Sequence, residues 1–171
     1  MKLHSIINLN KTHIIMKKIL LITLGLFLVL HVSAQKNSEI ESKPNEFGIH
    51  VGATTGMGLS YRRWIGPAGI QLTALPIITD DYNLTSLGVT ALYSLKETKY
   101  IRVYLYIGNH LLIRNDKVAF TYSEEYNIGI GPAFSFGRPV AFNIMFGYGL
   151  YDVLNNVNMF PTGEMGLYFK F

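Results

Sequence analysis

Hydrophobic residues alternate with polar or small residues along most of the chain from residue 46 onward, and this two-residue period is typical of β-strands. The clearest segment begins at residue 101. Its apolar positions are Ile101, Val103, Leu105 and Ile107, and the positions between them are Arg102, Tyr104, Tyr106 and Gly108. Seven other segments alternate in the same way, at about 46–54, 57–65, 69–77, 85–95, 126–136, 140–151 and 162–171. The pattern therefore predicts eight strands separated by turns.

The segment 162–171 has a wholly apolar face on one side. That face consists of Met165, Leu167, Phe169 and Phe171, and the opposite face consists of Glu164, Gly166, Tyr168 and Lys170. A transmembrane β-barrel needs this arrangement, because lipid covers one side of its wall and the lumen lies on the other. Strands of roughly 10 residues can span a membrane, and eight of them fit the chain. We therefore expect residues 46–171 to form a monomeric, all-β, eight-stranded antiparallel transmembrane barrel.

The connections between the predicted strands alternate in length. Short turns follow the second, fourth and sixth strands, whereas the connections 79–83, 109–125 and 152–161 are longer and polar. Outer-membrane barrels have short periplasmic turns and longer outer loops. The segment 109–125 continues the alternation on both sides of Asn115-Asp116, which predicts a hairpin that turns there and extends beyond the membrane. Pro132 lies within a predicted strand and suggests a β-bulge.

The N-terminal part of the chain resembles an export signal. Lys17 and Lys18 precede an almost unbroken apolar run from Ile19 to Leu30, and Val32 and Ala34 fit a small-residue cleavage site. The run is shorter than the roughly 20 residues that a spanning helix needs. We expect residues 1–15 to be an over-long start, 16–34 a cleavable signal peptide of the Sec type, and 35–45 a periplasmic linker.

The charge and the cysteine content bear on which partners and metal sites the chain can have. The chain has 15 basic and 11 acidic residues, but four lysines and no acidic residue lie in 1–34, so 11 basic residues match 11 acidic residues in the remainder. The basic pI of the full chain is thus no argument for a nucleic-acid partner. Without cysteine the chain has no lipid-attachment cysteine and no thiolate metal ligand.

With these features the chain resembles the small outer-membrane β-barrel family, to which the OmpA-type and OmpX-type barrels belong. The resemblance covers about 46–171 and rests on the alternation, the signal peptide and the terminal strand. It implies a location in the outer membrane of a Gram-negative bacterium. It also implies that the barrel-assembly machinery reads Met165, Leu167, Phe169 and Phe171 as a C-terminal signal.

Several polar side chains have inward parity and are candidates for a polar network in the lumen. They are His50, Arg62, Arg102, Tyr104, Tyr106, Glu164 and Lys170. Charges in a lumen with little water must pair, and eight strands enclose a space that side chains can fill. We therefore expect a plugged lumen, with a narrow solute or ion channel as the alternative. Two histidines without converging carboxylates predict neither a metal site nor a cofactor.

The sequence favours a structural or interaction role through the loops 79–83, 109–125 and 152–161, with 109–125 as the partner-binding surface, rather than an enzyme. Some eight-stranded barrels are enzymes that modify lipid A. The residues that would serve such chemistry here are His110, Asp116 and Ser123. A His-x-Ser pair, which one such family uses, is absent, because Leu111 and Leu112 follow His110. A soluble lipocalin-like carrier also has eight strands, but the apolar outward faces would then lie in water.

Overall fold

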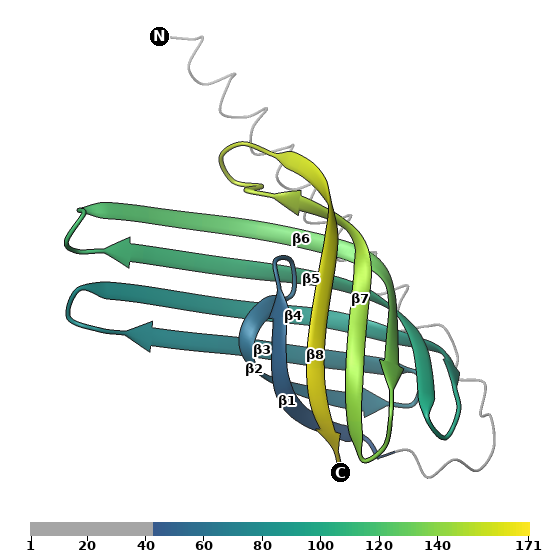
Figure 1. Ribbon diagram of the computed structural model, residues 1–171. Helices are drawn as coiled ribbons and strands as arrows, with labels where there is room; N and C mark the ends of the chain where they lie inside the picture. The colour runs from purple at the N-terminus through teal and green to yellow at the C-terminus, as the bar shows by residue number, and fades with distance from the viewer. Residues whose placement is uncertain (1–42) are drawn as a thin grey trace, which may run out of the picture. The chain divides into compact units, whose positions relative to one another are not determined.

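The computed structural model describes residues 43–171, which form eight antiparallel strands closed into one barrel (Figure 1). Each strand pairs with its sequence neighbours, and the first pairs with the last. The strands are β1 (Asn45–Gly52), β2 (Gly56–Ile65), β3 (Ala68–Ile78), β4 (Tyr82–Glu97), β5 (Ile101–Asp116), β6 (Thr121–Phe136), β7 (Val140–Tyr151) and β8 (Asn158–Lys170). The predicted eight-stranded antiparallel barrel is confirmed.

Some of the predicted segments lie outside the described residues. These are the over-long start 1–15, the signal peptide 16–34 and most of the linker 35–45. Asn45, the last residue of the predicted linker, pairs with Arg63 as the first residue of β1. Within 43–171 there is no helix with the length and apolar character to cross a membrane.

The alternation of side chains follows the prediction around the whole ring. Ile49, Leu59 and Leu167 point outward and are 59%, 58% and 46% exposed, whereas the inward Arg62 and Gln71 are fully buried. Because successive residues of a strand point to opposite faces, the barrel has an apolar outer wall and a lumen filled mainly with polar and aromatic side chains. This is the reverse of a water-soluble protein, which places its apolar side chains inside.

The strands differ in length, and the difference produces two projecting hairpins. β4, β5 and β6 have 16 residues each, whereas β1 has 8. β2 pairs with β3 only as far as Leu59 opposite Ala74, and β6 pairs with β7 only from Ile128 opposite Leu150. Beyond these pairs β3–β6 continue as a four-stranded extension beyond the rest of the barrel (Figure 1). We call this extension, residues 75–86 and 110–127, the projecting sheet.

The hairpin predicted for 109–125 is present, but the predicted position of its turn is wrong. Asn115 and Asp116 still belong to β5, and the turn consists of residues 117–120. The Asp116 carboxylate accepts hydrogen bonds from the amides of Val118 (3.0 Å) and Ala119 (2.8 Å). This side-chain cap favours a turn after Asp116 rather than at it.

The predicted bulge at Pro132 is also wrong. Pro132 is opposite Leu105 in an unbroken β5–β6 register, and the β6–β7 register is the same on both sides of it. The pairing of β6 with its two neighbours therefore accommodates Pro132 without the extra residue that a bulge would insert. A register shift occurs instead between Ser94 and Lys96, where β4 has one more residue than β5.

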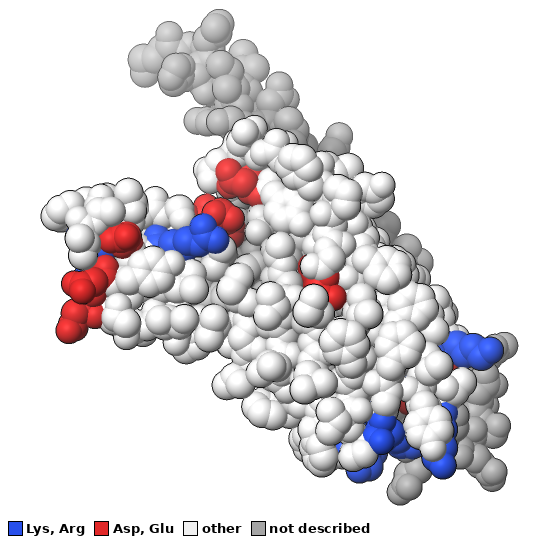
Figure 2. Space-filling model, in the orientation of Figure 1, with Lys and Arg blue, Asp and Glu red and all other residues white. Residues whose placement is uncertain are grey.

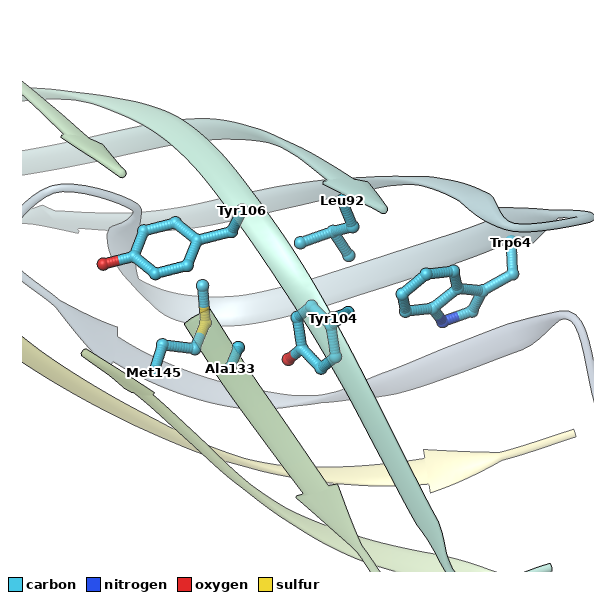
Figure 3. Packing of buried hydrophobic residues seen from close by; sticks show 6 residues of the cluster. All are labelled: Trp64, Leu92, Tyr104, Tyr106, Ala133 and Met145. Carbon is cyan, nitrogen blue, oxygen red and sulfur yellow. The ribbon is translucent and has the colours of Figure 1, made fainter. Parts of the chain in front are cut away.

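The middle of the lumen contains an aromatic and apolar cluster (Figure 3). Its members are Trp64, Leu92, Tyr104, Tyr106, Ala133 and Met145, which come from β2, β4, β5, β6 and β7. The Trp64 and Tyr104 rings meet edge to face, with 5.5 Å between their centroids. Side chains from different strands thus meet across the interior of the barrel.

Candidate functional site

The lumen holds two polar groups of residues, one toward each end of the barrel. The first, the ionic cluster, consists of Glu46, Glu97, Arg62 and Arg102 and lies toward the end with the short turns. The second, the turn latch, consists of Thr54, Thr55 and Glu164 and lies toward the projecting sheet.

Glu46 is at the centre of the ionic cluster. One of its carboxylate oxygens accepts a hydrogen bond from Arg102 Nη1 at 2.9 Å, and the other lies 3.6 Å from Arg62 Nη1. Both arginines and Glu46 are at most 2% exposed. A buried carboxylate shared by two guanidinium groups avoids the large cost of an unpaired buried charge.

The remaining contacts of Arg62 fix its position in the lumen. Its Nε donates to Gln71 at 2.6 Å, and its Nη2 donates to Asn143 at 2.7 Å. The guanidinium lies 3.8 Å from the centroid of the Tyr168 ring. A planar guanidinium can use its edge for hydrogen bonds and its face for an aromatic ring at the same time. Arg62 therefore links β2, β3, β7 and β8 across the interior.

Arg102 joins the ionic cluster to the short-turn end of the barrel. Its Nη2 donates to Glu97 at 2.6 Å, and its guanidinium lies 4.1 Å from the Trp64 ring centroid. Glu97 has outward parity if β4 is counted without interruption. The register shift between Ser94 and Lys96 pairs Glu97 with Arg102 instead, which turns its side chain inward. Sequence periodicity misses Glu97 for this reason.

The turn latch holds the β1–β2 turn inside the barrel. The hydroxyls of Thr54 and Thr55 donate to the two carboxylate oxygens of Glu164, and the Thr54 amide donates to the same carboxylate at 3.0 Å. Both threonines are fully buried. The first predicted strand, 46–54, therefore ends too late, because the chain leaves the wall after Gly52 and folds into the lumen.

Glycines opposite the turn make room for it. Gly108, Gly129 and Gly149 are register partners on β5, β6 and β7. A Cβ atom on Gly129 would collide with the Thr54 hydroxyl, and one on Gly108 would lie 2.7 Å from a Thr55 methyl. This row of small inward residues is the one signal in the sequence that could have indicated the inserted turn. The general expectation that small barrels need lumenal glycines does not predict such a turn.

The two histidines hold the inserted turn from either side. His50 Nε2 lies 2.7 Å from the Thr55 hydroxyl and 3.5 Å from a Glu164 oxygen. His110 Nδ1 lies 2.9 Å from the Ala53 carbonyl, which can only accept, so this nitrogen carries a proton. His110 Nε2 is 2.9 Å from the Ser86 hydroxyl. Within residues 43–171 no group of three or more His, Cys, Asp or Glu side chains is arranged to hold a metal ion.

The three residues considered for lipid A chemistry are not brought together. His110 is buried beneath the inserted turn, whereas Asp116 caps the turn at the hairpin tip and Ser123 is exposed opposite Arg114. Six residues of extended strand separate His110 from Asp116, a distance of roughly 20 Å. Acid–base and nucleophilic catalysis needs hydrogen-bond contact between such groups.

All seven predicted lumenal residues have buried side chains. The structure brings Arg62, Arg102 and Tyr104 to the ionic cluster and its aromatic neighbours, and His50 and Glu164 to the turn latch. Tyr106 belongs to the aromatic and apolar cluster, and Lys170 is 6% exposed near the short-turn end. The sequence interpretation missed Glu46, Thr54 and Thr55. Glu46 has inward parity at the first position of the predicted strand 46–54.

Solved structures similar to this chain include two β-barrels. The N-terminal β-barrel domain of Pseudomonas aeruginosa OprF matches with a TM-score of 0.51 and 14% sequence identity, over 74% of this chain and 95% of that chain. Neisserial surface protein A (NspA) matches with a TM-score of 0.48 and 14% identity, over 74% of this chain and 93% of that chain. No family model and no curated protein matches the sequence. The chain therefore has the fold of the OmpA/OmpX-type small outer-membrane barrels, as its sequence predicted.

Proposed function

We propose that the chain is an integral outer-membrane protein of a Gram-negative bacterium that acts as an interaction module, with its binding surface on the projecting sheet and its lumen closed. The observation that carries this proposal is the contrast along β3–β6. In the barrel these strands enclose a lumen that buried side chains occupy, and toward their tips they continue as an exposed sheet.

The outer wall supports the membrane location. Large apolar side chains face outward from every strand, among them Ile49, Leu72, Ile107 and Ile144. A soluble protein exposes a contiguous apolar patch of this extent only where it binds something. A lipocalin-like carrier in water is disfavoured for the same reason. Hydrocarbon satisfies the whole wall at once, and closure of the ring gives every wall strand a neighbour on both edges.

The contents of the lumen argue against a channel. The ionic cluster links β1, β2, β4 and β5 near one end, and the turn latch links the β1–β2 turn to β8 near the other. Tyr104, Tyr106 and Met145 fill the space between them (Figure 3). Moving an ion through this lumen would require breaking buried charge pairs, which costs several kcal/mol.

The projecting sheet supports the interaction role. Among the described residues, 75–78 of β3 pair only with β4, and 121–125 of β6 pair only with β5. Unpaired strand edges are sites where another chain can add a strand. Phe120 and Tyr122 are 93% and 63% exposed at the tip and beside it. Aromatic side chains of this kind are common anchors of protein interfaces.

Assembly of the barrel completes the proposal. The outward side chains at the end of the chain are Met165, Leu167 and Phe169 of β8 and Phe171 directly after it, and they would be read by the barrel-assembly machinery after export through the signal peptide. The closed ring has no unpaired wall strand, so the barrel would act as a monomer. The role requires no metal or cofactor.

Protease treatment of intact cells tests the proposed orientation. Trypsin should cut at Lys117 in the 117–120 turn, because this turn would lie outside the cell, and the barrel should stay protected. The Arg114→Gln/Lys117→Gln variant is the control and should resist cutting. Cleavage at Lys96 or Lys99 in intact cells would invert the orientation and refute the proposal.

Planar-bilayer recording tests the closed lumen. The purified full chain should give no large steady conductance, because the ionic cluster and the turn latch block both ends. Stable openings of porin size would contradict the closed lumen and favour the channel.

A further inference from the structure

The two ends of the barrel differ in the charge that predominates. Figure 2 shows mainly acidic side chains, with basic ones beside them, toward the tips of the projecting hairpins, and basic side chains at the opposite end. The acidic residues near the projecting end are Asp80, Asp81, Asp116, Glu124, Glu125 and Asp152. The basic residues at the short-turn end, outside the lumen, are Lys43, Arg63, Lys96, Lys99 and Arg138, and we call this set the basic belt.

The acidic side chains Glu46 and Glu97 of the short-turn end form no ion pair with Arg63, Lys96 or Lys99. Glu46 is 1% exposed and is shared by two lumenal arginines. Glu97 points inward after the register shift and is bound by Arg102. The two carboxylates are therefore committed to the ionic cluster, and among residues 43–171 no acidic side chain pairs with these three outer cations.

The basic belt lies at the level of the aromatic side chains that end the apolar wall. Arg63 follows Tyr61 on the outward face of β2 and is opposite Ile70 of β3. Lys96 is opposite the outward Val103 and follows Tyr93 on β4. Lys99 lies in the next turn, with its Nζ 5.4 Å from the Tyr100 ring centroid. Aromatic girdles mark the boundary between hydrocarbon and headgroups, so these cations would sit at headgroup depth.

We propose that the basic belt binds the phosphate groups of anionic phospholipids in the periplasmic leaflet. This inference rests on the proposed membrane location and adds a lipid partner to it. Long Lys and Arg side chains next to a bilayer extend to the phosphates, and each contributes about fivefold to binding an anionic surface at moderate salt. The acidic projecting end would repel the same headgroups, so the preference is confined to one leaflet.

The argument favours lipid over a soluble polyanion because of geometry. The belt residues are distributed around the circumference, on β2, in the β4–β5 turn and in the β6–β7 turn, rather than gathered on one surface. Two of them, Arg63 and Lys96, point outward from the wall itself. Headgroups surround a barrel in the same way, whereas a single polymer would cover one side.

Spin-labelled lipids test the proposal directly. The full chain is refolded into vesicles of phosphatidylcholine with 20 mol% phosphatidylglycerol, and electron spin resonance measures the motionally restricted fraction of each labelled lipid. We expect a preference of about two- to fivefold for labelled phosphatidylglycerol over labelled phosphatidylcholine at low salt. We expect 1 M NaCl to reduce it toward one, because salt screens exposed charges.

Matched variants locate the preference. Arg63→Gln/Lys96→Gln/Lys99→Gln should reduce the preference to near one, whereas Arg114→Gln/Lys117→Gln, which removes two cations from the projecting end, should retain it. If the triple variant does not fold, Lys96→Gln/Lys99→Gln, at the end of β4 and in the turn after it, should lower the preference by about half. Equal restriction of both lipids by the parent chain, or loss of selectivity in the projecting-end control, overturns the inference.

The same experiment separates this inference from the proposed function. A folded chain that restricts neither labelled lipid is not embedded in the bilayer, and the membrane location then fails. A chain that restricts both lipids equally is embedded but has no headgroup preference, and only the lipid partner fails.

Discussion

The barrel half and the projecting half of β5 carry the same alternation but have different surroundings. In the barrel, Arg102 and Tyr104 point into the lumen and are at most 2% exposed. Farther along the same face, the side chain of Arg114 is 48% exposed and lies 3.6 Å from a Glu125 oxygen. The two arginines have the same parity on the same strand. Closure of the ring, rather than the sequence pattern, decides whether a charged side chain is buried or wet.

The comparison predicts different energies for similar ion pairs. A buried charge without a partner costs several kcal/mol, whereas an exposed pair in water contributes little, because solvent screens it. The lumenal pairs should therefore decide the stability of the barrel. The pair on the projecting sheet should be almost neutral for stability and available for contacts with a partner.

Removing the shared carboxylate of the ionic cluster should have the largest effect. Glu46→Ala leaves Arg62 and Arg102 without their common partner, and we expect a loss of about 3–5 kcal/mol in the free energy of unfolding. Urea unfolding from vesicles, followed by tryptophan fluorescence of Trp64, measures this loss. Glu125→Ala is the control and should change stability by less than about 1 kcal/mol. Equal effects of the two variants would contradict the comparison.

A charge on the outward face should also distinguish the two halves. Leu105→Arg places a cation near the middle of the proposed hydrocarbon layer and should cost roughly 2–4 kcal/mol. Ile113→Arg has the same parity eight residues later on β5, beyond that layer, and should cost about 1 kcal/mol or less. Folding in bilayers, assayed by heat-modifiable electrophoretic mobility and urea titration, provides the comparison. If Leu105→Arg were as stable as the parent, the outward assignment of Leu105 would be wrong.

Periodicity predicted the elements that depend on the wall. The eight strands, the inward parity of Arg62 and Glu164, and the hairpin around 109–125 all follow from which residues tolerate each side of a closed sheet. The signal is strong there, because a one-residue slip would exchange the two faces of a strand.

The features that the sequence interpretation missed depend on contacts between distant residues. Glu97 turns inward only because of a register shift that no residue type announces. Thr54 and Thr55 resemble an ordinary polar turn until Glu164 of β8 and the glycines of β5–β7 lie around them. The sequence shows that Asp116 favours a turn nearby. It does not show whether this residue precedes the turn or lies within it.

A single methyl group tests the fit of the inserted turn. Gly129→Ala places a Cβ atom against the Thr54 hydroxyl, so the turn must shift, and we expect a loss of about 1–3 kcal/mol. Gly163→Ala is the matched control, because a Cβ atom there meets nothing within 4 Å. Urea titration of both variants measures the difference. If both were as stable as the parent chain, the glycine row would not be needed to seat the turn.

The smallest expected effect concerns the hairpin tip, where the change should be local. Asp116→Ala removes the acceptor of the Val118 and Ala119 amides, so the 117–120 turn should open more often. Loss of one such hydrogen bond corresponds to about a five- to tenfold faster cleavage at Lys117 by limiting trypsin, measured by mass spectrometry and divided by the rate for the denatured chain. This normalisation removes the direct effect of an acidic residue beside the cleavage site.

Asp80→Ala removes the same charge from the neighbouring β3–β4 turn and should leave the rate near that of the parent. The barrel should unfold at the same urea concentration in both variants, because the tip lies beyond the closed ring. Faster cleavage in both variants would assign the effect to charge rather than to the cap, and a lower unfolding midpoint would mean that the projecting sheet and the barrel are not separable.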